Sequence, residues 1–281
     1  MDWILGGCRV ILLFYWYSFL GWAVESAICS STGKKLVNRG FLNGPVCPVY
    51  GVGALVCIYL LYPVQDYPVL LYLFGTILVS VVEYFTGWLL ETLFHARWWD
   101  YSHYRFNLKG RVCLPNALFF GVLALFAMKV LHPFSVRILG RLSPVATFVC
   151  TGVLSAVFAA DLVLSVRAAI QLSGKLDEMR AALADARARA DAAIQEGRLQ
   201  AALFAAMSPQ EKLQALRELH VDSALLDRIS RLAEHQSLLH RRLMNAFPHM
   251  QFPRSPASLE TLRSEWDRLR RERRAKKQSE S

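Results

Sequence analysis

Acidic and basic side chains recur at matched positions in the first half of the sequence, inside or beside long apolar runs. Glu25 and Glu91 each follow Gly and Trp in the pattern GWxxE. An arginine, Arg39 or Arg105, stands fourteen residues after each glutamate. Glu83 lies eight residues before Glu91, which is about 12 Å along a helix. Because ionisable groups in apolar segments usually face a cavity, a partner or a boundary, these residues are candidates for solute binding or proton relay. The alternative is a structural ion pair that ties each loop to its helix.

Other chemistries lack the residues that they need. The sequence contains no GxxxxGK[ST] phosphate-binding loop and no GxSxG or HExxH motif, so ATP hydrolysis by this chain itself is not expected. Its six cysteines show no CxxC spacing, and His95 and His103 have no third ligand beside them. We predict buried, inert thiols, no metal site and no cofactor. Asp161, an acid near the end of an apolar run, is expected to find a backbone or water partner.

The elements that position these groups are apolar enough to be membrane helices. Hydrophobic residues make up 54% of the chain, which is too high for an ordinary soluble protein of this length. The sequence predicts five spans, each of them an apolar run, of which the second is short. They cover residues 3–28, 49–62, 69–90, 114–131 and 145–166.

An internal repeat organises the first four of these spans. A gapless offset of 66 residues gives nine identities in the 29 positions from 19 to 47, whereas about two are expected from ordinary residue usage. The matched residues of the first copy are Phe19, Gly21, Trp22, Glu25, Arg39, Leu42, Gly44, Val46 and Cys47. We predict a tandem duplication of a two-span unit, with repeat 1 at about 3–62 and repeat 2 at about 69–131. The two copies then enter the membrane in the same sense.

The distribution of basic residues predicts the orientation. The long loops after the first and third spans carry Lys34, Lys35 and Arg39 in one case and four basic residues in the other, while the short loop between the repeats has only Asp66. The positive-inside rule therefore places both long loops and the tail in the cytoplasm, and the N-terminus outside. Arg137 and Arg141 oppose this orientation, because they lie between the fourth and fifth spans, on the side that it places outside.

Residues 167–281 have a different pattern, with 21 Lys and Arg against 15 Asp and Glu. Apolar residues at alternating three- and four-residue spacings predict a coiled coil, which would bind protein partners or make homo-oligomers. Its seam is Leu172, Leu176, Met179, Leu183, Ala186, Ala190 and Ala193. Further helices are expected after Ser208, over 223–246 and after Ser255. The basic end, 268–277, fits a solvated terminus or contact with anionic lipid, and without a recognition motif nucleic acid is not favoured.

Four strings resemble the type IV ABC-transporter membrane family labelled CmpB-like: YSFLGWAVES, NRGFLNGPVCPVYG, EYFTGWLLETLFHARWWDYS and FNLKGRVCLPNALFFG. The resemblance covers about residues 13–140. It implies a polytopic protein of the bacterial cytoplasmic membrane with a permease role, and a separate nucleotide-binding ATPase subunit as partner. Arg105 is a candidate because of the repeat, and the resemblance implies further functional candidates on the matching strings. They are Glu25, Asn38, Arg39, Glu83, Glu91, Asp100, Asn107 and Arg111.

These observations predict an all-α polytopic membrane bundle at 1–166, with a cytoplasmic helical or coiled-coil tail at 167–281. The first hypothesis for its function is a permease subunit that moves a solute across the membrane. One alternative is a membrane-anchored scaffold that works through the tail. Another is an intramembrane enzyme acting on a lipid-like substrate, which needs two groups convergent on one cavity.

Overall fold

The structure is a computed structural model, and it describes residues 2–33, 38–195, 207, 211, 238–247 and 250. The chain divides into two compact units, which are described separately. Unit 1 comprises Met1–Leu93, Arg97–Ala168 and Arg242–Met250. Unit 2 comprises Phe94–Ala96, Ala169–Arg241 and Gln251–Ser281.

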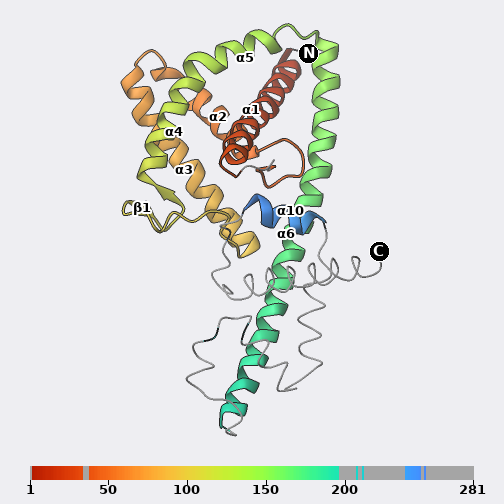
Figure 1. Cartoon of the computed structure of the whole chain (residues 1–281). Helices are drawn as coiled ribbons and strands as arrows, with labels where there is room; N and C mark the ends of the chain where they lie inside the picture. The colour runs from red at the N-terminus through yellow and green to blue at the C-terminus, as the bar shows by residue number, and fades with distance from the viewer. Residues whose placement is uncertain are drawn as a thin grey trace. The chain divides into compact units, whose positions relative to one another are not determined.

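The described elements are almost all helices (Figure 1). The α-helices are α1 (Asp2–Gly33), α2 (Pro48–Leu60), α3 (Pro68–Phe94), α4 (Leu114–Phe126), α5 (His132–Leu139), α6 (Pro144–Gln195) and α10 (Leu238–Ala246). The shorter elements are the 3₁₀ turn η1 (Tyr62–Val64), the π-helical turn η2 (Ala127–Leu131) and the strands β1 (Asn107–Leu108) and β2 (Val112–Cys113). This confirms the prediction of a mostly helical protein.

Four helices, rather than the five predicted, are long and apolar enough to cross a membrane. They are Asp2–Ser31, Pro68–Phe94, Leu114–Leu139 and Pro144–Ala182. The remaining apolar helix, α2, has only 13 residues, so it extends about 20 Å against a hydrocarbon layer of about 30 Å. The predicted orientation needs an odd number of crossings and therefore requires α2 to cross as well. That orientation stays a prediction.

The fourth predicted span extends further than expected. We predicted its end at Leu131 and a surface linker over 132–143, but the helix continues through η2 and α5 to Leu139. Pro133 stands two residues after the end of η2, as the second residue of α5. A proline inside a helix removes one backbone hydrogen bond, and a π-helical turn is one of the ways in which a helix absorbs such a defect.

The last predicted span and the beginning of the tail form a single helix, α6, of 52 residues. Ser143 caps its start, because the Ser143 hydroxyl accepts a hydrogen bond from the backbone N–H of Ala146 at 3.2 Å, and Pro144 is the first helical residue. Neither Gly152 nor Gly174 interrupts it. The chain therefore continues from its apolar part into its polar part without a loop.

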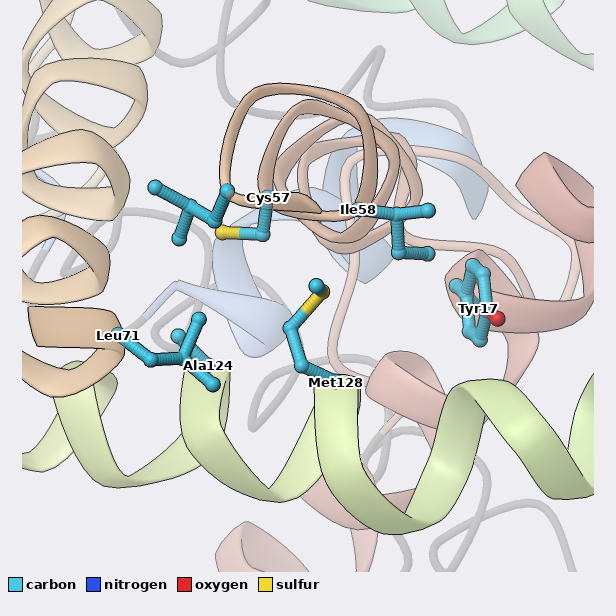
Figure 2. Packing of buried hydrophobic residues seen from close by; sticks show 7 residues of the cluster. Tyr17, Cys57, Ile58, Leu71, Ala124 and Met128 are labelled. Carbon is cyan, nitrogen blue, oxygen red and sulfur yellow. The ribbon is translucent and has the colours of Figure 1, made fainter. Parts of the chain in front are cut away.

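The core of unit 1 draws side chains from both predicted repeats. Seven buried residues form the cluster, and Figure 2 shows them facing one another from α1, α2, α3, α4 and the turns beside them. They are Tyr17, Cys57, Ile58, Leu61, Leu71, Ala124 and Met128. This packing ties together the helices that carry the candidate functional residues.

The two predicted repeats share their sequence of elements. Each has a long helix, a loop, an extended cysteine as N-cap (Cys47 or Cys113) and then a 13-residue helix with proline in its first turn. The second loop also contains the antiparallel pair β1–β2, in which Asn107 faces Cys113. The turn between these strands has positive φ angles at Lys109 and Gly110. The likeness of the elements is compatible with a duplication, which stays a prediction.

The tail is described only in part. In unit 2, three residues of the predicted seam, Leu172, Leu176 and Met179, are buried, and so is Ala182. The other seam side chains lie outside the described residues, as do the basic end and the helices expected after Ser208 and Ser255. Of the helix expected over 223–246, the structure describes α10. The coiled coil stays a prediction.

Candidate functional site

Glu25 and Arg39 form the ion pair of the first predicted repeat. The Nε of Arg39 lies 3.2 Å from Oε1 of Glu25. The backbone N–H of Arg39 also donates to Ser26 at 3.2 Å, and the Tyr50 hydroxyl donates to Glu25. Tyr50 reaches this position because α2 packs closely on α1, where a Cβ at Gly21 would lie 2.2 Å from the Tyr50 ring. The contact combines the predicted candidates with a tyrosine that the sequence analysis did not single out.

Asn38 shapes the turn that follows this pair. Its side-chain oxygen accepts a hydrogen bond from the indole N–H of Trp22 at 2.6 Å, and its amide nitrogen donates to the backbone carbonyl of Asn43 at 2.7 Å. The first bond ties the loop to α1, and the second closes the turn within the loop. The geometry gives Asn38 a positioning role.

Asp161 of α6 holds the same turn from another side. Its carboxylate accepts hydrogen bonds from the backbone N–H groups of Asn43 at 3.0 Å and Gly44 at 2.7 Å, and from the Asn43 side chain at 2.9 Å. Ser165 adds a fourth bond at 3.2 Å. The expectation of a backbone partner for Asp161 is confirmed.

Glu91 forms a larger ion cluster in the second predicted repeat. Its partners are Arg97 and Arg111, whereas the spacing predicted Arg105. The Oε1 atom of Glu91 lies 3.1 Å from Nε of Arg97, and its Oε2 atom lies 2.8 Å from Nη2 of Arg111. The Nη1 atom of Arg111 also donates to the Tyr84 hydroxyl at 3.0 Å. Burial lowers the pKa of Arg111, but the hydrogen bonds and charge of Glu91 outweigh burial, so the net pKa is raised. Arg105, the repeat counterpart of Arg39, is exposed and lies over the Phe106 ring instead. The predicted pairing of Glu91 with Arg105 is therefore not observed.

Glu91→Ala should lower the free energy of unfolding by about 2–3 kcal/mol, because it leaves two partly buried guanidinium groups without their carboxylate. The side chains of this cluster are less than one-third exposed. Thermal unfolding of the detergent-solubilised protein measures the effect. The matched control is Arg105→Ala, which should change stability by less than about 0.5 kcal/mol. Equal effects of the two substitutions would contradict a structural role for the Glu91 cluster.

Glu83 is the deepest of the candidate acids. It is 8% exposed on α3, and its Oε2 has no hydrogen-bond partner among the described residues. The Tyr101 hydroxyl hydrogen-bonds to Glu83, and Asn116 of α4 hydrogen-bonds to Tyr101. Burial, followed by the charge of Glu83, raises the pKa of Tyr101, so its phenol stays protonated and able to donate.

The acids of the two predicted repeats are linked through interactions of Tyr50 and Tyr101. Tyr101 interacts electrostatically with Glu25 as well as with Glu83, and Tyr50 interacts with Tyr101. We call Glu25, Tyr50, Glu83, Tyr101 and Asn116 the acid cluster. Its two carboxylates and two phenols can accept and donate protons or bind a polar solute. The sequence analysis missed Tyr50 and Asn116, although the 66-residue offset makes them equivalent positions.

The remaining candidates stabilise the second loop. The carboxylate of Asp100 accepts from the backbone N–H of Ser102 at 3.0 Å and from its hydroxyl at 2.9 Å. The side-chain oxygen of Asn107 accepts from the Gly110 N–H at 2.8 Å, and its nitrogen donates to the Tyr104 carbonyl at 2.7 Å. Asp100 and Asn107 are thus engaged within the loop, outside the acid cluster.

Cys47 is predicted to resist alkylation in the folded protein. Burial and the charge of Glu25 raise the pKa of its thiol from 9.0 to about 12. Because the thiolate is the reactive form, the thiolate fraction at pH 8 is about a thousandfold lower than for a free thiol. Maleimide labelling with peptide mass spectrometry should find Cys47 unmodified until the chain is unfolded in dodecyl sulfate. Rapid labelling of Cys47 in the folded state would contradict this prediction. Cys57 and Cys113 are likewise buried, whereas Cys8 and Cys29 are half-buried and Cys150 is exposed, so the prediction of burial holds for three of the six cysteines.

The sequence analysis gave no indication of a contact between the tail and the first loop. Arg242 of α10 donates to the backbone carbonyls of Gly40, Phe41 and Leu42. Arg39 donates to the carbonyl of Ala246. These residues all belong to unit 1.

The fold and these clusters define a helical membrane protein with ionisable groups gathered at its apolar helices. Residues 12–166, more than half of the chain, match the family described as putative ABC-transporter type IV, and the chain belongs to that family. The match extends beyond the 13–140 resemblance and includes the first part of α6. No curated protein and no solved structure gives a significant match.

Proposed function

We propose that this chain is the permease subunit of a transporter and that the acid cluster handles the solute or a coupling proton. Membership of the family and four apolar helices support a transporter-like membrane protein. The observation that carries the finer proposal is the burial of Glu83 with one carboxylate oxygen unpartnered among the described residues. A buried ionisable group in a membrane helix is costly, so its retention favours a functional use.

The two loop ion pairs complete the proposed site. Glu25 of the acid cluster pairs with Arg39, and Glu91 pairs with Arg97 and Arg111. An arginine can bind a carboxylate or phosphate of a solute through two parallel hydrogen bonds. We assign the membrane domain to 1–166 and the partner-binding tail to 167–281. Both long loops are assigned to the cytoplasm, where a separate nucleotide-binding ATPase subunit would contact them.

The test is accumulation of small molecules by inverted membrane vesicles that contain the full chain. Vesicles are incubated with ATP and a bacterial cell extract, washed, and analysed by untargeted mass spectrometry beside vesicles that lack the chain. The proposal predicts at least one compound that accumulates only when the chain is present. It also predicts a nucleotide-binding protein among the co-purifying proteins. Absence of both would contradict the permease proposal.

A further inference from the structure

Three consecutive carbonyl groups of the first loop converge on one side chain. Nη2 of Arg242 lies 2.7 Å from the carbonyl oxygen of Gly40 and also donates to that of Leu42, while Nη1 lies 3.3 Å from that of Phe41. A guanidinium group is a rigid, planar set of five donors. It can therefore donate to several carbonyls at once from different nitrogens. A lysine has all its donors on one nitrogen and fits three separate carbonyls less well.

The loop backbone is arranged so that its carbonyls are available. Its next two N–H groups, those of Asn43 and Gly44, donate to the carboxylate of Asp161. The acceptors of the loop thus bind a cation while its donors bind an anion. Arg242 and Asp161 also attract each other electrostatically. The loop backbone therefore forms a site for a cationic group. Its carbonyls bind the cation, and its N–H groups are held by the nearby anion.

A second set of contacts covers Arg39. Its Nη1 donates to the backbone carbonyl of Ala246. Its guanidinium carbon lies 5.2 Å from the centre of the Phe247 ring, and that ring packs edge-on against Trp98 with a centroid distance of 4.9 Å. Leu243 and Ala246 of the same segment are buried. The tail segment therefore occupies donors of Arg39 that Glu25, which is bound at Nε, leaves unused.

We propose that the Gly40, Phe41 and Leu42 carbonyls form a guanidinium-binding site that Arg242 fills as an internal ligand, and that the docked segment 242–247 shields Arg39 from solutes. The docking is independent of the permease proposal. The functional consequence, inhibition by the tail, rests on that proposal, because it requires Arg39 to take part in solute binding. Release of the segment exposes Nη1 of Arg39 and the carbonyls together.

The experiment is labelling of the full chain in lipid nanodiscs with phenylglyoxal, which modifies arginine at its terminal nitrogens. Adducts at Arg39 are quantified by peptide mass spectrometry, with exposed Arg105 as the labelling reference. Arg111 of the Glu91 cluster reports on the integrity of the fold. The variants are Arg242→Ala and Phe247→Ala, and Arg241→Ala is the matched control that removes the same charge from the same helix.

Arg242→Ala should raise labelling of Arg39 about tenfold, the change in a docking equilibrium expected when one charge-assisted hydrogen bond is lost. Phe247→Ala should also raise it, whereas Arg241→Ala should not. Labelling of Arg105 and Arg111 should stay constant. Unchanged Arg39 labelling in both Arg242→Ala and Phe247→Ala overturns the proposal. If Arg242→Ala also exposes Arg111, that variant is unfolded and the result for Phe247→Ala decides.

The vesicle assay separates docking from inhibition. Greater accumulation by Arg242→Ala than by the unmodified chain supports shielding of a working Arg39. Raised labelling of Arg39 with unchanged accumulation overturns inhibition by the tail. If the unmodified chain and Arg242→Ala both accumulate no compound and no nucleotide-binding protein co-purifies, the permease proposal fails, and labelling alone still decides the docking.

Discussion

Glu83→Gln is expected to abolish solute accumulation in the vesicle assay while leaving the thermal unfolding temperature close to that of the unmodified protein. Glutamine has the shape of glutamate and still offers an oxygen that can accept the Tyr101 hydrogen bond. It cannot carry a negative charge or exchange a proton, which are the properties that the permease proposal requires of Glu83. A buried carboxyl with an unpartnered oxygen adds little stability, so its neutral isostere should fold well.

Two comparisons make this result specific. Asp66→Asn neutralises an acid whose side chain is 84% exposed and whose ion pair with Lys129 is long, at 3.6 Å, so it should retain full accumulation. Tyr101→Phe removes the donor to Glu83 and should reduce accumulation without abolishing it. Full accumulation by a stable Glu83→Gln variant would exclude Glu83 as a functional carboxylate. Its role in the buried position would then be structural only.

The sequence predicts helices well in this chain and their ends less well. Apolar runs with few charges form helices wherever they occur, because backbone groups in an apolar setting must bond to one another. The extension of α4 through Pro133 was not predicted, since proline usually stops a helix and the sequence does not show that η2 absorbs the defect. The bounds of α2 lie close to the short apolar run predicted over 49–62, but the sequence analysis counted this run as a span although it is shorter than the hydrocarbon layer requires.

The ion pairs show how far a repeat can be used to predict contacts. Glu25 and Arg39 pair as the sequence analysis suggested. At the equivalent position, the strands β1 and β2 redirect the loop, so Arg105 is exposed and Arg111 reaches Glu91. A change of loop conformation thus replaces one arginine by another while the charge pair survives. Asn43 and Lys109 occupy equivalent positions in the two loops, and their different conformations could not be inferred from the spacing.

Contacts between distant segments left no signal in the sequence. Arg242 is about 200 residues from the carbonyls that it binds. Because every residue has a backbone carbonyl, the sequence does not indicate which of them would bind an arginine. Tyr101, which the sequence analysis did not single out, hydrogen-bonds to Glu83 of another element. The first loop depends on Asp161 and Arg242 from outside the predicted repeat, whereas Asp100 and Asn107 satisfy the second loop from within. The two loops are therefore stabilised by different means.

This dependence predicts that Asp161→Ala will be among the most destabilising single substitutions in residues 1–166. It removes the acceptor for the backbone N–H groups of Asn43 and Gly44 and for the Asn43 side chain. Donors left without a partner cost about 1–3 kcal/mol each in a dry setting and less where water or another group replaces the acceptor. We expect a loss of about 2–4 kcal/mol, measured by thermal unfolding in detergent.

The same substitution should loosen the first loop specifically. Hydrogen exchange of the peptide that contains Asn43 and Gly44 should accelerate in Asp161→Ala, while the peptide that contains Glu91 keeps its exchange rate. Asp66→Ala is the control, because it removes an exposed carboxylate and should change stability by less than about 0.5 kcal/mol. Ser165→Ala, which removes only one bond to the Asp161 carboxylate, should have an intermediate effect. If Asp161→Ala unfolds at the temperature of Asp66→Ala, the hydrogen bonds to Asp161 do not hold the loop, because water then replaces them without loss.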